Sequence, residues 1–188
     1  MKRVLLAVAM IAWGCGSTPA SRFYTLSAAP PASPPAVASD LSVAVGPVSV
    51  PLAVDRPQMV VTLNSNQVRL DELNRWASPL ANNVARVVAE NLVSMLGTPH
   101  VILSPQTANV DYRAAIEVQR FESGPGEAAT LDAVWTVSHD ADGRSRTGRT
   151  TAREAAPDSS YDALTAAHSR AVARLSRDIA DAVLALHR

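Results

Sequence analysis

The sequence predicts an α+β fold in which an antiparallel or mixed β-sheet carries two amphipathic helices packed on one face. Two helix-length segments place apolar residues three and four positions apart, which puts those residues on one face of each helix. Several shorter segments alternate apolar with polar residues, or are rich in valine and threonine, as strands are. Along the chain the order is strands, a helix, more strands and a final helix.

The first group of strands is expected before residue 71. These strands cover residues 23–26, 41–50, 58–63 and 67–70. Gly46 and Pro47 interrupt the second one, and because proline has no N–H to donate, we expect a bulge or a sheet edge there. Residues 64–66 form a hairpin-like turn between the third and fourth strands.

The first helix is predicted to begin at Ser78 and Pro79, with the serine hydroxyl as the N-cap and the proline at the first helical position. Its apolar face follows helical spacing up to Leu96. Gly97 and Pro99 then end the helix, since glycine suits the left-handed cap and proline cannot continue the helix.

The second half of the chain predicts four more strands and the final helix. The strands cover residues 100–103, 110–121, 129–139 and 144–155. The turn at 124–126 joins the second and third of these as an antiparallel hairpin, and the fourth is polar enough to lie exposed or at an edge. Asp158 or Ser159 is the expected cap of a long helix that keeps three-four spacing almost to the C-terminus.

The N-terminus has the pattern of an export signal. Two basic residues precede the apolar residues 4–12, and Cys15 follows the small residue Gly14. This arrangement predicts a lipoprotein signal peptide at 1–14, cleaved before a Cys15 that is then acylated. Ala12 and Trp13 depart from the usual residues of a lipoprotein cleavage site, so a plain secretory signal with an incidental cysteine is the alternative.

The predicted organisation has three parts. Residues 1–14 are the signal peptide, residues 15–40 are a lipidated N-terminus with a short strand and a proline-rich tether, and residues 41–188 form a single α+β domain. Whether the strand at 23–26 docks on the domain stays open. If it does, about seven residues separate it from the lipid, which is a reach of at most about 25 Å.

Composition limits the classes of partner and chemistry. Without Lys2 and Arg3 the mature chain has 15 basic and 17 acidic side chains, which is not the basic surface that nucleic acid requires. A lone cysteine has no disulfide partner within the chain. The four histidines are not spaced as metal ligands, and His168 is expected to be partly buried and hydrogen bonded. The adjacent residues 138–140 are Ser-His-Asp, but strand alternation separates their side chains. We therefore expect no enzyme activity, no metal and no cofactor.

Three motifs in a fixed order give the chain a family resemblance. They are Arg56-Pro57-Gln58 before a strand, Arg75-Trp76-Ala77-Ser78-Pro79-Leu80 before the first helix, and Ala89-Glu90-Asn91-Leu92 within it. With these motifs the chain resembles the ABC-type transport auxiliary lipoproteins (the PqiC/YmbA-like family). Its opening residues 23–26, the 131–135 segment and the closing helix also fit that family.

The resemblance implies a non-catalytic outer-membrane lipoprotein of an ABC lipid-transport system of the mammalian cell entry (MCE) type. Such a protein would dock to the periplasm-spanning MCE protein and its ABC permease and ATPase complex, and would self-associate into a ring or other oligomer. It would contact outer-membrane lipid through acylated Cys15. The alternative is a periplasmic carrier that binds phospholipid directly.

The motif residues are also the candidate partner contacts. They are Arg56, Pro57, Gln58, Arg75, Trp76, Pro79, Leu80, Glu90 and Asn91. Either Arg75 stacks on the Trp76 indole, or Trp76 fills the core while Arg75 pairs with a carboxylate. Arg56 is either an exposed recognition residue or part of a local ion pair. Glu90 and Asn91 are expected to bond to a neighbouring loop.

Overall fold

A computed structural model describes residues 19–30, 40–104 and 109–188. The predictions about the signal peptide, Cys15 and most of the proline-rich tether fall outside these residues. Within them the α+β class is confirmed, but the strands divide between two sheets where the sequence predicted one.

The larger sheet has five strands in the order β5-β2-β6-β7-β8. These are β5 (Val101–Leu103), β2 (Val43–Ser49), β6 (Tyr112–Gly124), β7 (Ala128–His139) and β8 (Ser145–Ala155). The predicted hairpin between β6 and β7 is confirmed, and β8 lies at the sheet edge as expected. The β2 strand runs parallel to both of its neighbours, with a register shift between Val45 and Val48 at the predicted interruption.

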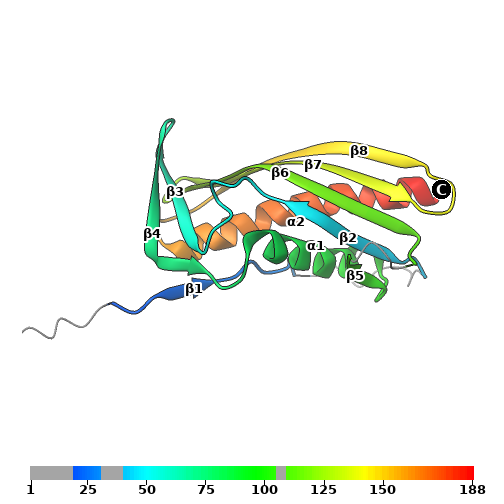
Figure 1. Cartoon of the computed structure of the whole chain (residues 1–188), viewed down its shortest axis with the longest axis horizontal. Helices are drawn as coiled ribbons and strands as arrows, with labels where there is room; N and C mark the ends of the chain where they lie inside the picture. The colour runs from blue at the N-terminus through cyan, green and yellow to red at the C-terminus, as the bar shows by residue number, and fades with distance from the viewer. Residues whose placement is uncertain (1–18, 31–39, 105–108) are drawn as a thin grey trace, which may run out of the picture.

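Two helices cover one face of this sheet, α1 (Leu80–Leu96) and α2 (Tyr161–His187) (Figure 1). Their apolar stripes meet the inward side chains of β2, β6 and β7 in one continuous core. Leu164, Leu175 and Ile179 of α2 are fully buried, which is the burial that the three-four spacing predicted. No helix in the described ranges is long and apolar enough to cross a membrane.

The helix caps differ from the predicted ones. Pro79 is the N-cap of α1 and no side chain caps it, so Ser78 does not take the predicted role. The α2 cap is Ser160, whose hydroxyl accepts a hydrogen bond from the Ala163 N–H, rather than Asp158 or Ser159. Gly97 ends α1 in the left-handed conformation with φ 67°, as predicted.

The smaller sheet stands at one end of the molecule and has the order β1-β4-β3 (Figure 1). Its strands are β1 (Arg22–Tyr24), β4 (Gln67–Trp76) and β3 (Gln58–Asn64). The β4 strand is much longer than the predicted residues 67–70, and it ends at Trp76, where a loop was expected. A bulge allows the extension, because the Asp71 carboxylate accepts hydrogen bonds from the N–H groups of Leu73 and Asn74.

The segment of residues 22–30, called here the strap, docks on the body of the protein. It begins as β1, parallel to β4, and continues across both helices. Leu26 is 1% exposed. The backbone N–H groups of Ser27 and Ala29 donate to Ser169 of α2 and Asn91 of α1, at 3.1 Å and 2.9 Å. The sequence left open whether the strand at 23–26 docks on the domain, and the structure shows that it does.

Candidate functional site

The first two motifs lie side by side where β3 begins and β4 ends. The Trp76 N–H donates to the Pro57 carbonyl at 2.7 Å, and Gln58 pairs with Arg75 in the sheet register. Two segments that are separated by eighteen positions in the sequence thus form one surface just before α1.

That surface contains a pocket of about 390 Å³, called here the motif pocket. It is lined by Asp55, Arg56, Pro57, Trp76, Ala77, Ser78 and Pro79. The two prolines, the alanine and the indole make most of the wall apolar, while Asp55 and Arg56 place opposite charges at one side. A pocket of this composition suits an apolar side chain that is flanked by polar groups.

Trp76 forms the inner wall of the motif pocket and is 5% exposed. Its ring packs edge-on against Phe121 and His168, with centroids 6.0 Å and 6.2 Å away. Arg75 points elsewhere, since its Nε donates to the Glu72 carbonyl at 2.9 Å and a terminal nitrogen lies 3.4 Å from the Glu72 carboxylate. Trp76 is therefore a core residue and Arg75 pairs with a carboxylate, which is the second of the two arrangements considered.

The remaining residues of the first two motifs have separate environments. Gln58 donates from its amide to Glu72 at 3.1 Å, and Leu80 is fully buried at the start of α1. Arg56 is exposed, and its side chain forms no hydrogen bond or ion pair with the described residues. Arg56 is thus free to meet a partner at the rim of the pocket.

The third motif faces the strap instead of the pocket. Asn91 is 1% exposed, and its carbonyl oxygen accepts the hydrogen bond from Ala29 while its amide donates to Ser176 at 3.0 Å. Glu90 pairs with Arg86 at 2.7 Å. The structure confirms the expected hydrogen bond from Asn91 to a neighbouring segment. Glu90 does not bond to that segment itself but pairs with Arg86, which does.

Arg86 and Asn83 are strap contacts that the sequence did not indicate. One terminal nitrogen of Arg86 donates to the Leu26 carbonyl at 2.6 Å and to the Asn83 side-chain oxygen at 2.9 Å. Both residues lie one helical turn from motif positions, so the helical periodicity of α1 could have suggested them.

His168 is wholly buried, where the sequence predicted partial burial. Its ring stacks on Phe121 with centroids 3.9 Å apart, and Nε2 lies 2.8 Å from the Ser123 hydroxyl. Burial lowers the pKa of His168 to about 3, so the ring is neutral at physiological pH. Among the described residues no group of three or more acidic, histidine or cysteine side chains could hold a metal ion.

Asp71 and Tyr161 form a polar link between the small sheet and α2. The Tyr161 hydroxyl donates to the Asp71 carboxylate at 2.6 Å. Burial raises the pKa of Asp71, but hydrogen bonds from Tyr161, Asn74 and Leu73 outweigh it and hold that pKa at about 2. Burial and the same contact raise the pKa of Tyr161 to about 12. At neutral pH Asp71 is therefore ionised and Tyr161 is neutral, and their hydrogen bond joins β4 to α2.

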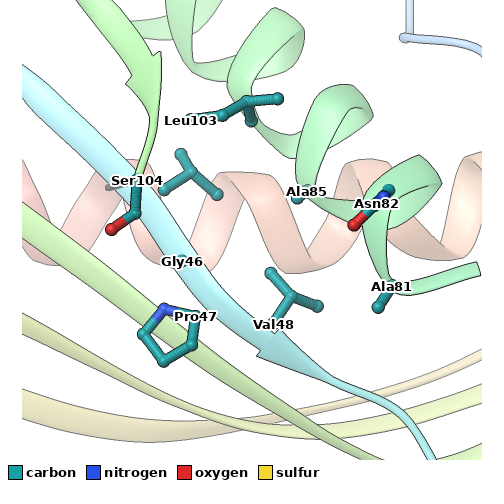
Figure 2. A pocket seen from close by; sticks show the side chains of 9 residues that line it. Gly46, Pro47, Val48, Ala81, Asn82, Ala85, Leu103 and Ser104 are labelled. Atoms are coloured by element: carbon teal, nitrogen blue, oxygen red, sulfur yellow. The ribbon is translucent and has the colours of Figure 1, made fainter. Parts of the chain in front are cut away.

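A second pocket, of about 360 Å³, lies between the first turns of α1, β2 and the end of β5 (Figure 2). Its walls are Val45, Gly46, Pro47, Val48, Ala81, Asn82, Ala85, Leu103 and Ser104. None of them is acidic, basic or a thiol, and none is a predicted site residue.

Comparison with known proteins gives a family. Residues 24–180 match the family model described as the ABC-type transport auxiliary lipoprotein component. No curated protein matches the sequence.

Two solved structures share the fold. The crystal structure of an uncharacterized protein superposes with a TM-score of 0.73 at 20% identity, over 88% of this chain and 99% of that one. Protein XCC0632 from Xanthomonas campestris gives a TM-score of 0.62 at 22% identity, over 84% and 92% of the two chains.

Proposed function

The chain belongs to the family of ABC-type transport auxiliary lipoprotein components, and from this premise we propose that it is a non-catalytic outer-membrane lipoprotein that docks to the MCE protein of a lipid-transport system. The observation that supports docking is the convergence of two motifs on the motif pocket. Partner contacts would come from exposed Arg56, from Pro57 and from Pro79, with Trp76 as the rigid floor.

The motif residues divide into three roles under this proposal. Arg56, Pro57, Trp76 and Pro79 form the pocket, while Gln58, Arg75 and Leu80 support the strands and helix that shape it. Asn91 holds the strap, which leads back to Cys15, and Glu90 pairs with the strap contact Arg86. Acylation of Cys15 would fix the protein to the membrane, because several acyl chains bind a bilayer far more firmly than one.

The packing of the interior favours docking over the alternative of a phospholipid carrier. The space between the large sheet and the helices is filled by buried side chains of both layers, including Val84, Val88, Leu131 and Leu175. An acyl chain would have to displace well-packed core residues, which is costly.

The test is a pull-down of the tagged full-length protein from detergent-solubilised envelopes, with intact-mass analysis of its N-terminus. We expect an MCE-domain protein in the eluate and a triacylated Cys15. A Ser78→Trp variant, which places a large ring at the pocket, should lose the MCE protein. Ser145→Trp at the start of β8 is the matched control and should keep it.

Three outcomes would contradict parts of this proposal. Equal recovery of the MCE protein with both variants would exclude the motif pocket as the contact. An unmodified Cys15 would exclude the lipid anchor. Stoichiometric phospholipid without any MCE protein would support the carrier instead. The predicted self-association can be read from the native mass of the same sample.

A further inference from the structure

The small sheet has one face turned to the core and one turned outward. Tyr24, Met59, Val61 and Trp76 point inward and are at most 9% exposed. The register places a different set on the opposite side, called here the outer face of the small sheet: Phe23, Gln58, Val60, Thr62, Val68, Leu70 and Arg75. Glu72 in the bulge contacts Gln58 and Arg75 of this face, and Val60 is its one buried apolar member, at 8% exposed.

This outer face exposes large apolar side chains. Phe23 is 65% exposed, Val68 is 58% exposed and Leu70 is 40% exposed. Val60 pairs directly with Leu70, so the apolar side chains follow the β3–β4 ribbon. In the large sheet, β6, β7 and β8 expose no large apolar residue, although the short edge strand β5 exposes Ile102 and Leu103 at 39% and 46%. Exposed apolar patches of this kind mark contact surfaces.

The route of the chain indicates what covers the outer face. Phe23 belongs to β1, and seven residues separate it from Cys15. An extended segment of that length reaches about 25 Å at most. A lipid anchor at Cys15 therefore holds this end of the protein close to the bilayer, whereas the β7–β8 turn lies at the far end (Figure 1).

We propose that the outer face of the small sheet rests on the phospholipid surface to which Cys15 is attached. This inference deepens the proposed function, since it relies on the anchor at Cys15. Phe23, Val68 and Leu70 would enter the boundary between headgroups and acyl chains, which removes their apolar surface from water. The Arg75 guanidinium lies on the same face, where its pairing with Glu72 keeps the charge of this part of the face balanced.

The strap would then set the orientation of the domain as well as its distance from the membrane. Because β1 is part of the small sheet, a pull toward the lipid brings Phe23 and its neighbours on β4 to the surface together. The large sheet and the C-terminal end of α2 would point into the aqueous space.

The experiment uses the full-length lipoprotein in vesicles of phosphatidylethanolamine and phosphatidylglycerol, with a fluorophore on one introduced thiol. Val68→Cys and Leu70→Cys place an environment-sensitive label on the outer face. Ser145→Cys places the same label at the far end of β8. An acylated Cys15 has no free thiol, so each protein carries one label. Intact mass gives the acylation state of the same sample.

We expect blue-shifted emission at positions 68 and 70, and loss of most of that emission when the acyl chains carry bromine. The label at position 145 should remain in water and unquenched. With Cys15 acylated, equal emission from all three positions would overturn the inference and leave the anchor intact. Blue-shifted emission without bromine quenching would also overturn it, because a protein would then cover the face.

The state of Cys15 separates the two proposals. If Cys15 is unmodified, the labels are placed in a Cys15→Ser background so that each protein still carries one label. If bromine then still quenches positions 68 and 70, the face binds lipid and only the anchor is wrong. If Cys15 is unmodified and no position is quenched, both proposals fail.

Discussion

Asn91 and Ser176 are joined across the interface of the two helices by a 3.0 Å hydrogen bond between the Asn91 amide and the Ser176 hydroxyl. The other end of the same amide binds the strap through Ala29. One buried side chain therefore connects α1, α2 and the strap. This gives the third motif a structural role that its sequence alone does not reveal.

The Asn91→Ala substitution should lower the free energy of unfolding by about 1–3 kcal/mol, because it removes the partner of the buried Ser176 hydroxyl and of the part-buried Ala29 N–H. Chemical denaturation of the purified protein measures the loss. Glu90→Ala is the neighbouring control, since its exposed ion pair with Arg86 contributes less than about 1 kcal/mol. Equal losses in the two variants would contradict the role given to Asn91.

The Arg86→Ala substitution should loosen the strap. It removes the hydrogen bonds to the carbonyl of Leu26 and to Asn83, so amide exchange should accelerate in residues 24–29 with little change in β6 and β7. Hydrogen-exchange mass spectrometry measures this. Arg177→Ala is the control. It removes an exposed arginine of α2 that forms no hydrogen bond or ion pair with the described residues, so the amide exchange of the strap should stay unchanged.

Stability should fall at acidic pH because of His168. Its pKa is about 3 in the folded protein and 6.5 in the absence of burial. Below pH 6.5 His168 is therefore protonated in the unfolded chain while it stays neutral in the folded protein. The stability contribution is complete above pH 6.5 and declines toward pH 3, by up to about 1.4 kcal/mol per pH unit. Denaturation of wild type and His168→Gln across this range tests the assignment, and identical pH slopes would refute it.

Gly148→Ala should destabilise the large sheet. A Cβ at this position would overlap the indole of Trp135, whose Nε1 donates to Thr150 at 3.1 Å. We expect a loss of about 1–3 kcal/mol, since a packed ring has nowhere to move, and a change in the near-ultraviolet signal of Trp135. Ser145→Ala on the same strand is the control and should stay close to wild type; a thermal melt separates the two.

Local patterns were enough to predict the long elements. The β6–β7 hairpin alternates apolar and polar residues around a Gly-Pro-Gly turn, and α2 keeps a three-four repeat over its whole length. Both depend on contacts between residues that are close in sequence or on a single buried face, and these are the signals that a sequence expresses directly.

The sequence could not predict the division into two sheets or the length of β4. The length of β4 depends on the Asp71 carboxylate, which accepts two backbone N–H groups and a hydrogen bond from Tyr161, ninety residues later. The division into two sheets depends on pairing between strands that are far apart in sequence, such as β1 with β4. The motif pocket could not be predicted from the sequence for a similar reason. Pro57 and Trp76 meet only because β3 and β4 pair, and the sequence shows the two motifs without their contact.

The strap also constrains the order in which the molecule can be completed. Ser27 donates its N–H to Ser169, 142 residues further along, so the binding site for the part of the strap after β1 is complete only when the last helix has formed. In a chain that emerges N-terminus first, the strap would stay undocked until the rest of the domain has folded. Closing so long a loop is a late and slow event. A protein shortened within α2 would therefore retain Cys15 and lose the α2 residues, such as Ser169, that hold the strap.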